Sequence, residues 1–163
     1  MAKLRNSKIK DRPALKKIVN RLHKQGKKVV FTNGCYDILH LGHVQLFRKS
    51  RSLGDALVVG INSDSSIRRL KGPGRPLVGQ NDRARVLEAL EPVDYVAVFG
   101  EDTPYELISD IKPDILVKGS DYRMNEIVGR GIVKRVVRFP LIKGRSTSGL
   151  IGKIVRRYGK TAR

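Results

Sequence analysis

The 163-residue sequence lacks the features that mark several large classes of protein. It contains a single cysteine, Cys35, so no disulfide can form within the chain, which is typical of a reducing compartment. No apolar run approaches the roughly 20 residues of a membrane-spanning helix. The start of the chain shows no apolar signal segment. We therefore expect a cytoplasmic protein, and the length favours one domain.

Aromatic residues are also scarce, and acidic residues are nearly absent where basic ones are most frequent. The formal net charge is +19, and the excess lies in residues 1–28 and 130–163. These ends either bind nucleic acid or an anionic surface, or form a solvated basic surface. Aromatics make up 6% of the chain and do not cluster there, so we expect no nucleic-acid partner. We divide the chain into a basic extension (1–11), a domain (12–155) and a basic tail (156–163).

Strand and helix patterns alternate along the sequence. Residues 56–61 are continuously apolar, which is typical of a parallel strand covered on both faces. The other predicted strands are residues 29–32, 94–99, 115–117 and 133–139. The predicted helices begin at residue 12 and cover 43–52, 65–70, 81–89, 104–111 (capped by Asp102 or Thr103) and 146–158. This order predicts an α/β fold: a single-domain open parallel sheet flanked by helices, with ligands at the carboxyl ends of the strands.

The segment most informative about function follows the first predicted strand. Asn33-Gly-Cys-Tyr-Asp37 leads to His40 and His43, which flank Gly42 just before a helix. A helix N-terminus offers unpaired N–H groups and a partial positive charge, and imidazoles add hydrogen-bond donors. Gly34 and Gly42 let a ligand approach the backbone closely. This arrangement predicts a phosphate-binding site.

Other sites are conceivable for two histidines three residues apart. A closed zinc site needs four ligands, and the chain offers only His23 and Cys35 in addition. We therefore predict no metal site held by the protein alone, and a purely structural pair stays open. Neither a P-loop nor a Gly-x-Gly-x-x-Gly turn follows the first predicted strand. The predicted fold is thus of the nucleotide-binding type, but the chain lacks both of these phosphate-binding motifs.

The polar segments at the predicted strand ends resemble the cytidylyltransferase-type nucleotidyltransferases. His40-Leu-Gly-His43 and Arg145-Ser-Thr-Ser148 carry this resemblance. A closer similarity, to the adenylyltransferase of ADP-heptose synthase, rests on seven segments in the family's order and spans about residues 12–155. These segments are Phe31-Thr-Asn-Gly-Cys35, Gly60-Ile-Asn-Ser-Asp64, Leu70-Lys-Gly-Pro-Gly-Arg-Pro76, Asp82-Arg-Ala-Arg-Val-Leu87, Glu101-Asp-Thr-Pro104, Lys118-Gly-Ser-Asp-Tyr122 and Gly144-Arg-Ser-Thr-Ser148.

This resemblance implies a Rossmann-like nucleotidyltransferase fold and a specific reaction. The adenylyl group of ATP would pass to D-glycero-β-D-manno-heptose 1-phosphate, giving ADP-heptose, a lipopolysaccharide precursor, and pyrophosphate. Mg²⁺ would arrive with the nucleotide. Because a sugar phosphate is already an anionic nucleophile, no general base is needed, and positioning with charge stabilisation suffices.

The resemblance also implies roles for individual residues. His40 and His43 would contact the α- and β-phosphates, and Lys71, on a loop, would reach a phosphate unless it is merely solvated. Arg83 would contact the acceptor phosphate or form a helix-surface salt bridge, and Asp37 would orient a histidine or fix the first turn. The catalytic set is His40, His43, Lys71 and Arg145; the nucleotide-binding set is Asn33, Gly34, Cys35, Asp37, Gly42, Asn62, Lys118, Gly119, Asp121, Ser146, Thr147 and Ser148.

Two other functions stay open at this point. A relative within the superfamily would use CTP or another acceptor, as a glycerol 3-phosphate cytidylyltransferase or an FAD synthetase does. A basic nucleic-acid-binding module would show binding that falls steeply with salt. The expected partners are small molecules, with a homodimer expected by resemblance. Bifunctional relatives carry a sugar kinase half that is absent here, so we expect a stand-alone adenylyltransferase or an excised domain.

Overall fold

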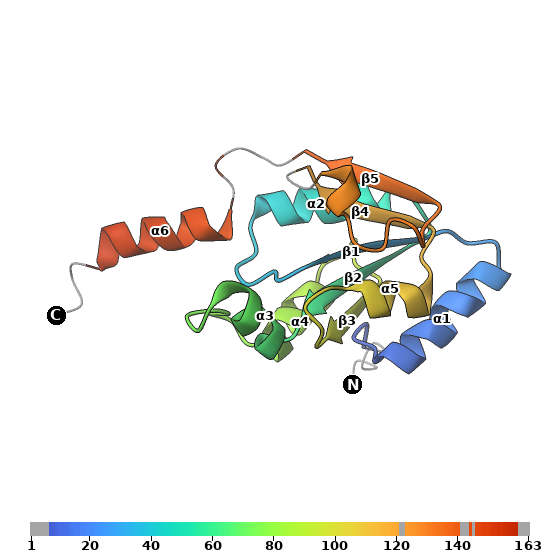
Figure 1. The fold of residues 1–163 in the computed structure, drawn as a ribbon, viewed down its shortest axis with the longest axis horizontal. Coiled ribbons are helices and arrows are strands. Elements are labelled where there is room, and N and C mark those ends of the chain that lie inside the picture. The colour runs from blue at the N-terminus through green and yellow to red at the C-terminus, as the bar shows by residue number, and fades with distance from the viewer. Residues whose placement is uncertain (1–6, 121–122, 141–143, 145, 160–163) are drawn as a thin grey trace, which may run out of the picture.

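The computed structural model describes residues 7–120, 123–140, 144 and 146–159. Its centre is a five-stranded sheet in the order β3-β2-β1-β4-β5, with all pairs parallel (Figure 1). The strands are β1 (Val29–Gly34), β2 (Ala56–Asn62), β3 (Tyr95–Phe99), β4 (Ile115–Gly119) and β5 (Arg135–Phe139). The order reverses between β1 and β4, and such a switch point is where ligands bind in open α/β sheets. The α/β prediction is therefore confirmed.

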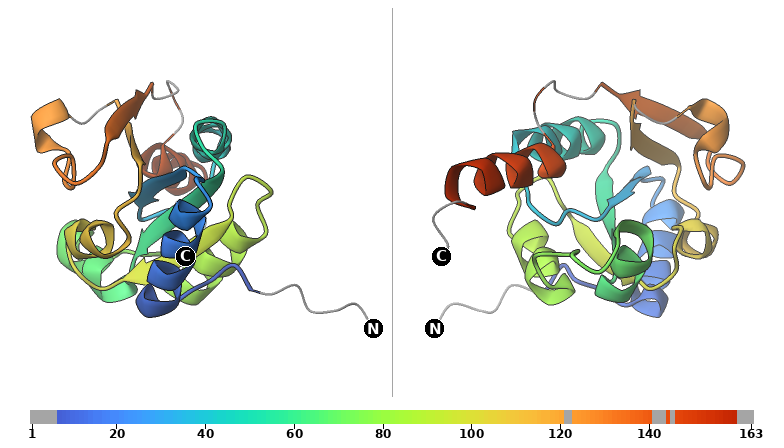
Figure 2. Two further views of the ribbon diagram at one scale, coloured as in Figure 1. Left: turned by 90° about the vertical axis from the view of Figure 1, so that its right-hand side faces the viewer. Right: turned by 60° about the vertical axis from the view of Figure 1, so that its left-hand side comes forward.

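Helices cover both faces of this sheet, as the views in Figure 2 show. Phe31 points into a buried cluster with residues of α1 and α5, whereas the adjacent Val30 points into a second cluster with residues of α2 and α4. This alternation explains why β1 and β2 read as continuous apolar runs. The helices are α1 (Arg12–Lys24), α2 (Leu41–Arg51), α3 (Asp64–Lys71), α4 (Gln80–Glu88), α5 (Tyr105–Ile111) and α6 (Thr147–Tyr158), with a 3-10 turn η1 (Met124–Glu126).

The start of α1 shows how the local sequence determines where a helix begins. The Asp11 carboxylate accepts a hydrogen bond of 2.8 Å from the Ala14 N–H, and Pro13 occupies the first turn. Both residues favour helix initiation. Leu15 and Val19 then place their side chains in the core without exposed area. The predicted helix thus begins at the expected residue.

Several boundaries differ from the sequence predictions. Residues 8–10 were assigned to the extension, but the Lys10 N–H bonds Val96 O and the Val96 N–H bonds Lys8 O, both at 2.9 Å. They therefore run along the β3 edge of the sheet. Neither Asp102 nor Thr103 caps α5; Pro104 holds that position, and Asp102 pairs with Arg69 at 2.7 Å.

The last helix lies apart from the layers that cover the sheet. In Figure 1 α6 extends away from the body, and none of its described side chains is buried. Its first turn meets the end of the loop before α2, where Thr147 Oγ1 donates to Ile38 O at 3.3 Å. None of the described helices is both long and apolar enough to cross a membrane.

Candidate active site

The predicted phosphate-binding residues gather where β1 ends and α2 begins. His40 is the N-cap residue of α2 and makes no side-chain capping bond, and His43 lies in the first turn. The two rings stack with centroids 3.8 Å apart and planes at 19°. The structure therefore presents both imidazoles together at the positive end of a helix dipole, beside the switch point of the sheet.

The charge state of His43 follows from this packing. Burial lowers the pKa of its imidazole to about 4, and the neighbouring His40 acts in the same direction. His43 is therefore neutral near pH 7, with one ring nitrogen donating and the other accepting. Its Nδ1 is buried, and no residue in the described part of the chain forms a hydrogen bond with it. A buried polar atom without such a partner is typical of a ligand site.

Tyr36 supports the histidine pair, a role that its sequence context does not predict. Its ring contacts the His43 imidazole edge-on, with centroids 5.1 Å apart, and Phe47 on another side at 5.1 Å. Tyr36 adopts φ 47°, a left-handed conformation that is costly for this residue. The only signal in the sequence is an aromatic residue within an otherwise polar turn.

The Tyr36 ring also explains the glycine before it. A Cβ atom on Gly34 would lie 3.0 Å from Cζ of that ring, which is too close for ordinary packing. The prediction that Gly34 opens the backbone to a ligand is therefore only part of its role. Gly34 also makes room for the aromatic ring that holds His43 in place.

Two adjoining cavities meet at this point. The smaller, of about 220 Å³, lies beside His43 and is lined by Arg75 and Thr147 among others. The larger, of about 380 Å³, is lined by Asn62, Lys71 and Lys118 and by further residues to which no role in binding is predicted above. Asn33, Gly34 and Cys35 line both cavities. The structure adds residues to the predicted site, namely 103–104 and 126–128, which line the larger cavity.

Asp37 has a different role from either of those expected. Its buried carboxylate accepts hydrogen bonds from Arg75 Nε at 2.6 Å and from the N–H groups of Leu77 and Val78, both at 2.8 Å. Burial raises the pKa of Asp37, but these hydrogen bonds outweigh it and hold the pKa below its ordinary value. Asp37 thus anchors the loop between α3 and α4 beside the smaller cavity, and the prediction that it orients a histidine is wrong.

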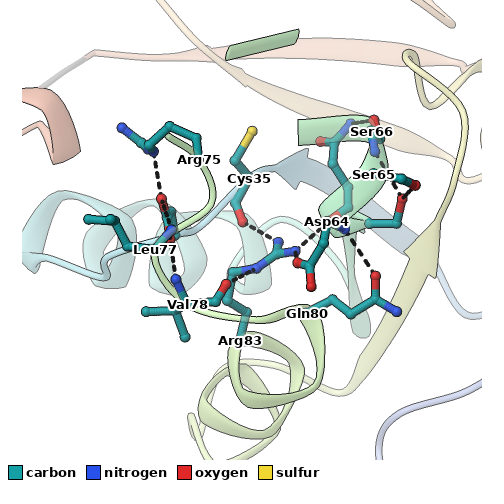
Figure 3. A network of polar contacts seen from close by, with 12 residues as sticks. Cys35, Asp64, Ser65, Ser66, Arg75, Leu77, Val78, Gln80 and Arg83 are labelled. Carbon is teal, nitrogen blue, oxygen red and sulfur yellow. Dashed lines mark hydrogen bonds and ion pairs between the residues drawn. The ribbon is translucent and has the colours of Figure 1, made fainter. Parts of the chain in front are cut away.

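Arg83 is buried, and the expectation of a helix-surface salt bridge is wrong (Figure 3). Its side chain is 0% exposed, so the geometry does not fit a contact with an acceptor phosphate either. It donates to Val78 O at 2.9 Å, Cys35 O at 2.7 Å and Asn62 O at 2.9 Å, and to the Asp64 carboxylate at 2.7 Å. Arg83 therefore joins the segments that form the rim of the site.

The other predicted site residues occupy varied positions. Lys71 is the last residue of α3 rather than part of a loop, and Lys118 lies near the end of β4 with 8% exposure. Ser146 accepts a capping bond of 3.1 Å from the Gly149 N–H, and Ser148 is exposed. Burial raises the pKa of the Cys35 thiol, which keeps it protonated and a poor nucleophile. Asp121 and Arg145 lie outside the described residues.

Comparison with known proteins agrees with this geometry. A family model described as cytidylyltransferase-like matches residues 31–157. The bifunctional protein HldE of Nitratiruptor sp. is 54% identical over 146 residues, which are 90% of this chain and 32% of that protein. HldE of Geobacter sulfurreducens is 51% identical over 159 residues, which are 95% of this chain and 32% of that protein. The chain thus spans about a third of the length of these curated relatives.

Two solved structures are similar as well. A lipopolysaccharide core biosynthesis protein from Thermoplasma volcanium is 31% identical, with a TM-score of 0.62 over 72% of this chain and 100% of that one. A pantoate-β-alanine ligase from Francisella tularensis shares the fold at 20% identity, with a TM-score of 0.62 over 88% of this chain and 69% of that one. From the match over residues 31–157 and these relatives, the chain belongs to the cytidylyltransferase-like family of nucleotidyltransferases.

Proposed function

We propose that this chain transfers the adenylyl group of ATP to D-glycero-β-D-manno-heptose 1-phosphate, releasing ADP-heptose and pyrophosphate. The observation that carries the proposal is the stacked pair of His40 and His43 at the start of α2, beside two adjoining cavities. The choice of sugar and base is supported by the identity of about half the residues with bifunctional HldE proteins.

In this reaction a phosphate oxygen of the sugar 1-phosphate attacks the α-phosphorus of ATP. The bond from the α-phosphorus to the bridging oxygen breaks, and pyrophosphate leaves with that electron pair. No proton has to be removed from the nucleophile. Neutral His43 donates from one nitrogen to a phosphoryl oxygen, and the N-terminus of α2 adds its partial positive charge.

The two cavities suit the two substrates. We place the triphosphate in the cavity beside His43, where Arg75 offers positive charge and Thr147 a hydroxyl. We place the sugar phosphate in the cavity of about 380 Å³, where Lys71 and Lys118 offer positive charge and the carboxylate of Glu126 accepts hydrogen bonds from hydroxyls. The role of Arg145 in holding the β- and γ-phosphates stays a prediction.

Mg²⁺ would enter with the triphosphate. In the part of the chain that the structure describes, no three His, Cys, Asp or Glu side chains are grouped closely enough to hold a metal ion. The residues present therefore fit an ion held mainly by phosphate oxygens and water, whose contribution is to neutralise phosphate charge.

The test is pyrophosphate release with Mg²⁺ and D-glycero-β-D-manno-heptose 1-phosphate, with ATP and CTP in separate reactions. We expect release with ATP alone, and a loss of about 100-fold or more in His40→Ala and His43→Ala. Gln45→Ala, an exposed neighbour on α2, is the matched control and should keep full activity. Release with CTP alone would favour the cytidylyltransferase alternative. Full turnover in both histidine variants would contradict the mechanism.

Two further proposals concern the setting of the enzyme. We propose a cytoplasmic enzyme, since its nucleotide substrate is found there, and a homodimer, by resemblance to related enzymes. Light scattering at the concentration used for the assay would measure the mass directly, and a monomeric mass with full activity would exclude an obligate dimer.

A further inference from the structure

A third cavity lies at the opposite end of the sheet from the active site. It has a volume of about 670 Å³ and is formed near the amino ends of β1, β4 and β5. The left view of Figure 2 faces this end of the molecule. Small-molecule sites in proteins have volumes of about 300–1,000 Å³. This cavity falls in that range, is larger than either cavity at the active site, and has no part in the proposed reaction.

The lining of this cavity combines an apolar floor with basic side chains. Its apolar residues are Leu53, Pro113, Ile115 and Ile132. Its basic residues come from three separate segments of the chain and are Lys27, Lys28, Lys112, Lys134 and Arg135. The remaining polar residues of the lining are His23 and Asp114. Such a lining suits an anion that carries an apolar group.

The carboxylates nearby do not cancel this positive charge. Asp114 is 8% exposed, and its oxygens already accept from the Val29 N–H at 2.9 Å and from Lys134 Nζ at 2.7 Å. His23 Nε2 lies 3.1 Å from the same carboxylate. Asp55, next to the cavity, accepts from the Lys28 N–H at 2.8 Å. Five cationic side chains therefore face two carboxylates, which leaves an excess of positive charge at the cavity.

Four of the cations remain available to a ligand. The side chains of Lys27, Lys28, Lys112 and Arg135 are exposed and form no ion pair within the described ranges of the chain. Grouped around a concave, partly apolar surface, they attract a phosphate more strongly than single exposed lysines do. An anion bound there would be contacted from several sides.

The backbone of Lys112 gives an independent indication. This residue ends α5 with φ 45° and ψ 62°, the left-handed conformation that helix ends normally assign to glycine. A residue with a side chain is strained there, and such strain clusters at functional positions. The chain therefore keeps a cation on the rim of the cavity where its backbone favours glycine.

We propose that this cavity is a second ligand site, which binds a small phosphorylated molecule with an apolar group. The site is independent of the phosphate site at His40 and His43, which lies at the carboxyl end of β1, whereas Lys28 precedes the start of that strand. The phosphate would contact Lys28, Lys112 and Arg135, and the apolar group would cover Ile132 and Leu53.

Phenyl phosphate is the probe, because it has a phosphate dianion and an apolar ring. Titrated into ¹⁵N-labelled protein, it should shift the amide signals of Gly26, Lys28, Lys112 and Ile132, and the affinity should fall with salt. Lys112→Gly should weaken this binding about tenfold while the protein stays folded, because glycine suits the local backbone. Lys112→Arg is the matched control, since it keeps the charge and the same backbone strain.

Three outcomes would overturn the proposal. The shifts could be confined to residues 33–43, which would place all phosphate binding at the active site. They could be equal in the wild type and in Lys112→Gly, which would mean that the cation plays no part. Benzyl alcohol, a neutral molecule of similar shape, could bind as tightly as phenyl phosphate, which would make the cavity apolar in function.

Discussion

The Tyr36 ring meets the His43 imidazole edge-on, with centroids 5.1 Å apart and planes at 85°. The same ring contacts Phe47, which lies one turn further along the helix of His43, so Tyr36 packs against two residues of α2. This relationship connects the hydrophobic core with the phosphate site. We therefore propose that Tyr36, which also lines the smaller cavity, positions His43.

Replacing Tyr36 by leucine should therefore lower kcat about tenfold or more, because His43 would lose the ring that fixes its orientation. Tyr36→Phe is the control. It keeps the ring and removes only a hydroxyl that lies 3.5 Å from Thr32 Oγ1, so activity should stay within about twofold. Pyrophosphate release measures both, and the ¹H NMR titration of His43 reports its surroundings. Equal activity in Tyr36→Leu and wild type would exclude the positioning role.

The low pKa of His43 predicts how folding stability depends on pH. In the unfolded chain the imidazole binds a proton near pH 6.5, whereas in the folded protein it does so only near pH 4. Between these values the unfolded state holds more protons, so the free energy of unfolding decreases as the pH falls from 6.5 towards 4. The loss is at most about 1.4 kcal/mol per pH unit.

Urea unfolding at pH 7, 5.5 and 4.5 tests this dependence. The wild type should lose more stability on acidification than His43→Gln, which cannot take up the proton. The difference between the two proteins should be largest at pH 4.5. Parallel curves for both across the three pH values would show that His43 does not carry the effect.

Arg83 should be among the residues that the fold tolerates least. Arg83→Met removes the donors to Val78 O, Cys35 O and Asn62 O and leaves Asp64 without its buried partner. Breaking such a buried network costs about 3–5 kcal/mol. Arg85→Gln, on the same helix, is the control and should change stability by less than about 0.5 kcal/mol, because the Arg85 side chain is 70% exposed and its ion pair with Glu88 is screened by water.

Urea denaturation of Arg83→Met and Arg85→Gln, compared with the wild type, measures both effects. Arg83→Lys separates charge from geometry. A single ammonium group cannot reach all four acceptors of a planar guanidinium, so most of the loss should persist. Full stability in Arg83→Lys would show that charge alone suffices at this position.

Residue patterns predicted the sheet well, because a parallel strand covered on both faces must be apolar throughout. Residues 56–61 follow this rule, and the structure has β2 there with every residue buried. The position of the histidine pair at a helix start was also predicted, since it depends on local spacing. These features depend on neighbours in sequence, which is why the sequence alone revealed them.

The residues whose roles were missed or predicted wrongly depend instead on features that sequence neighbours do not show. Arg83 has the pattern of a polar helix residue. Its burial depends on the carbonyl groups of Cys35 and Asn62, two distant segments that helical spacing does not show. Tyr36 owes its role to a left-handed backbone conformation that no tyrosine signals. The cavity residues 126–128 are brought in by the crossover between β4 and β5, and no motif marks them. Long-range packing, rather than local propensity, decided each of these positions.

Asp37 and Arg75 provide the last prediction. Asp37→Asn keeps the size of the side chain, but its amide has only one oxygen for three donors, those of Arg75, Leu77 and Val78. If that oxygen faces the two backbone N–H groups, the amide NH₂ faces the guanidinium, and the contact with Arg75 at 2.6 Å is lost. Arg75 would then leave the wall of the cavity beside His43.

We therefore expect Asp37→Asn to raise the KM for ATP about tenfold. Because a neutral amide oxygen accepts more weakly than a carboxylate, hydrogen exchange at the Leu77 and Val78 amides should also become faster. Arg75→Gln should raise the KM similarly, because it removes the same positive charge, while exchange at those two amides stays slow, since their carboxylate acceptor remains. This difference distinguishes a loop anchored by Asp37 from a loop held by Arg75. Slow exchange in both variants would mean that the loop is fixed by other contacts, and the anchoring role of Asp37 would be wrong.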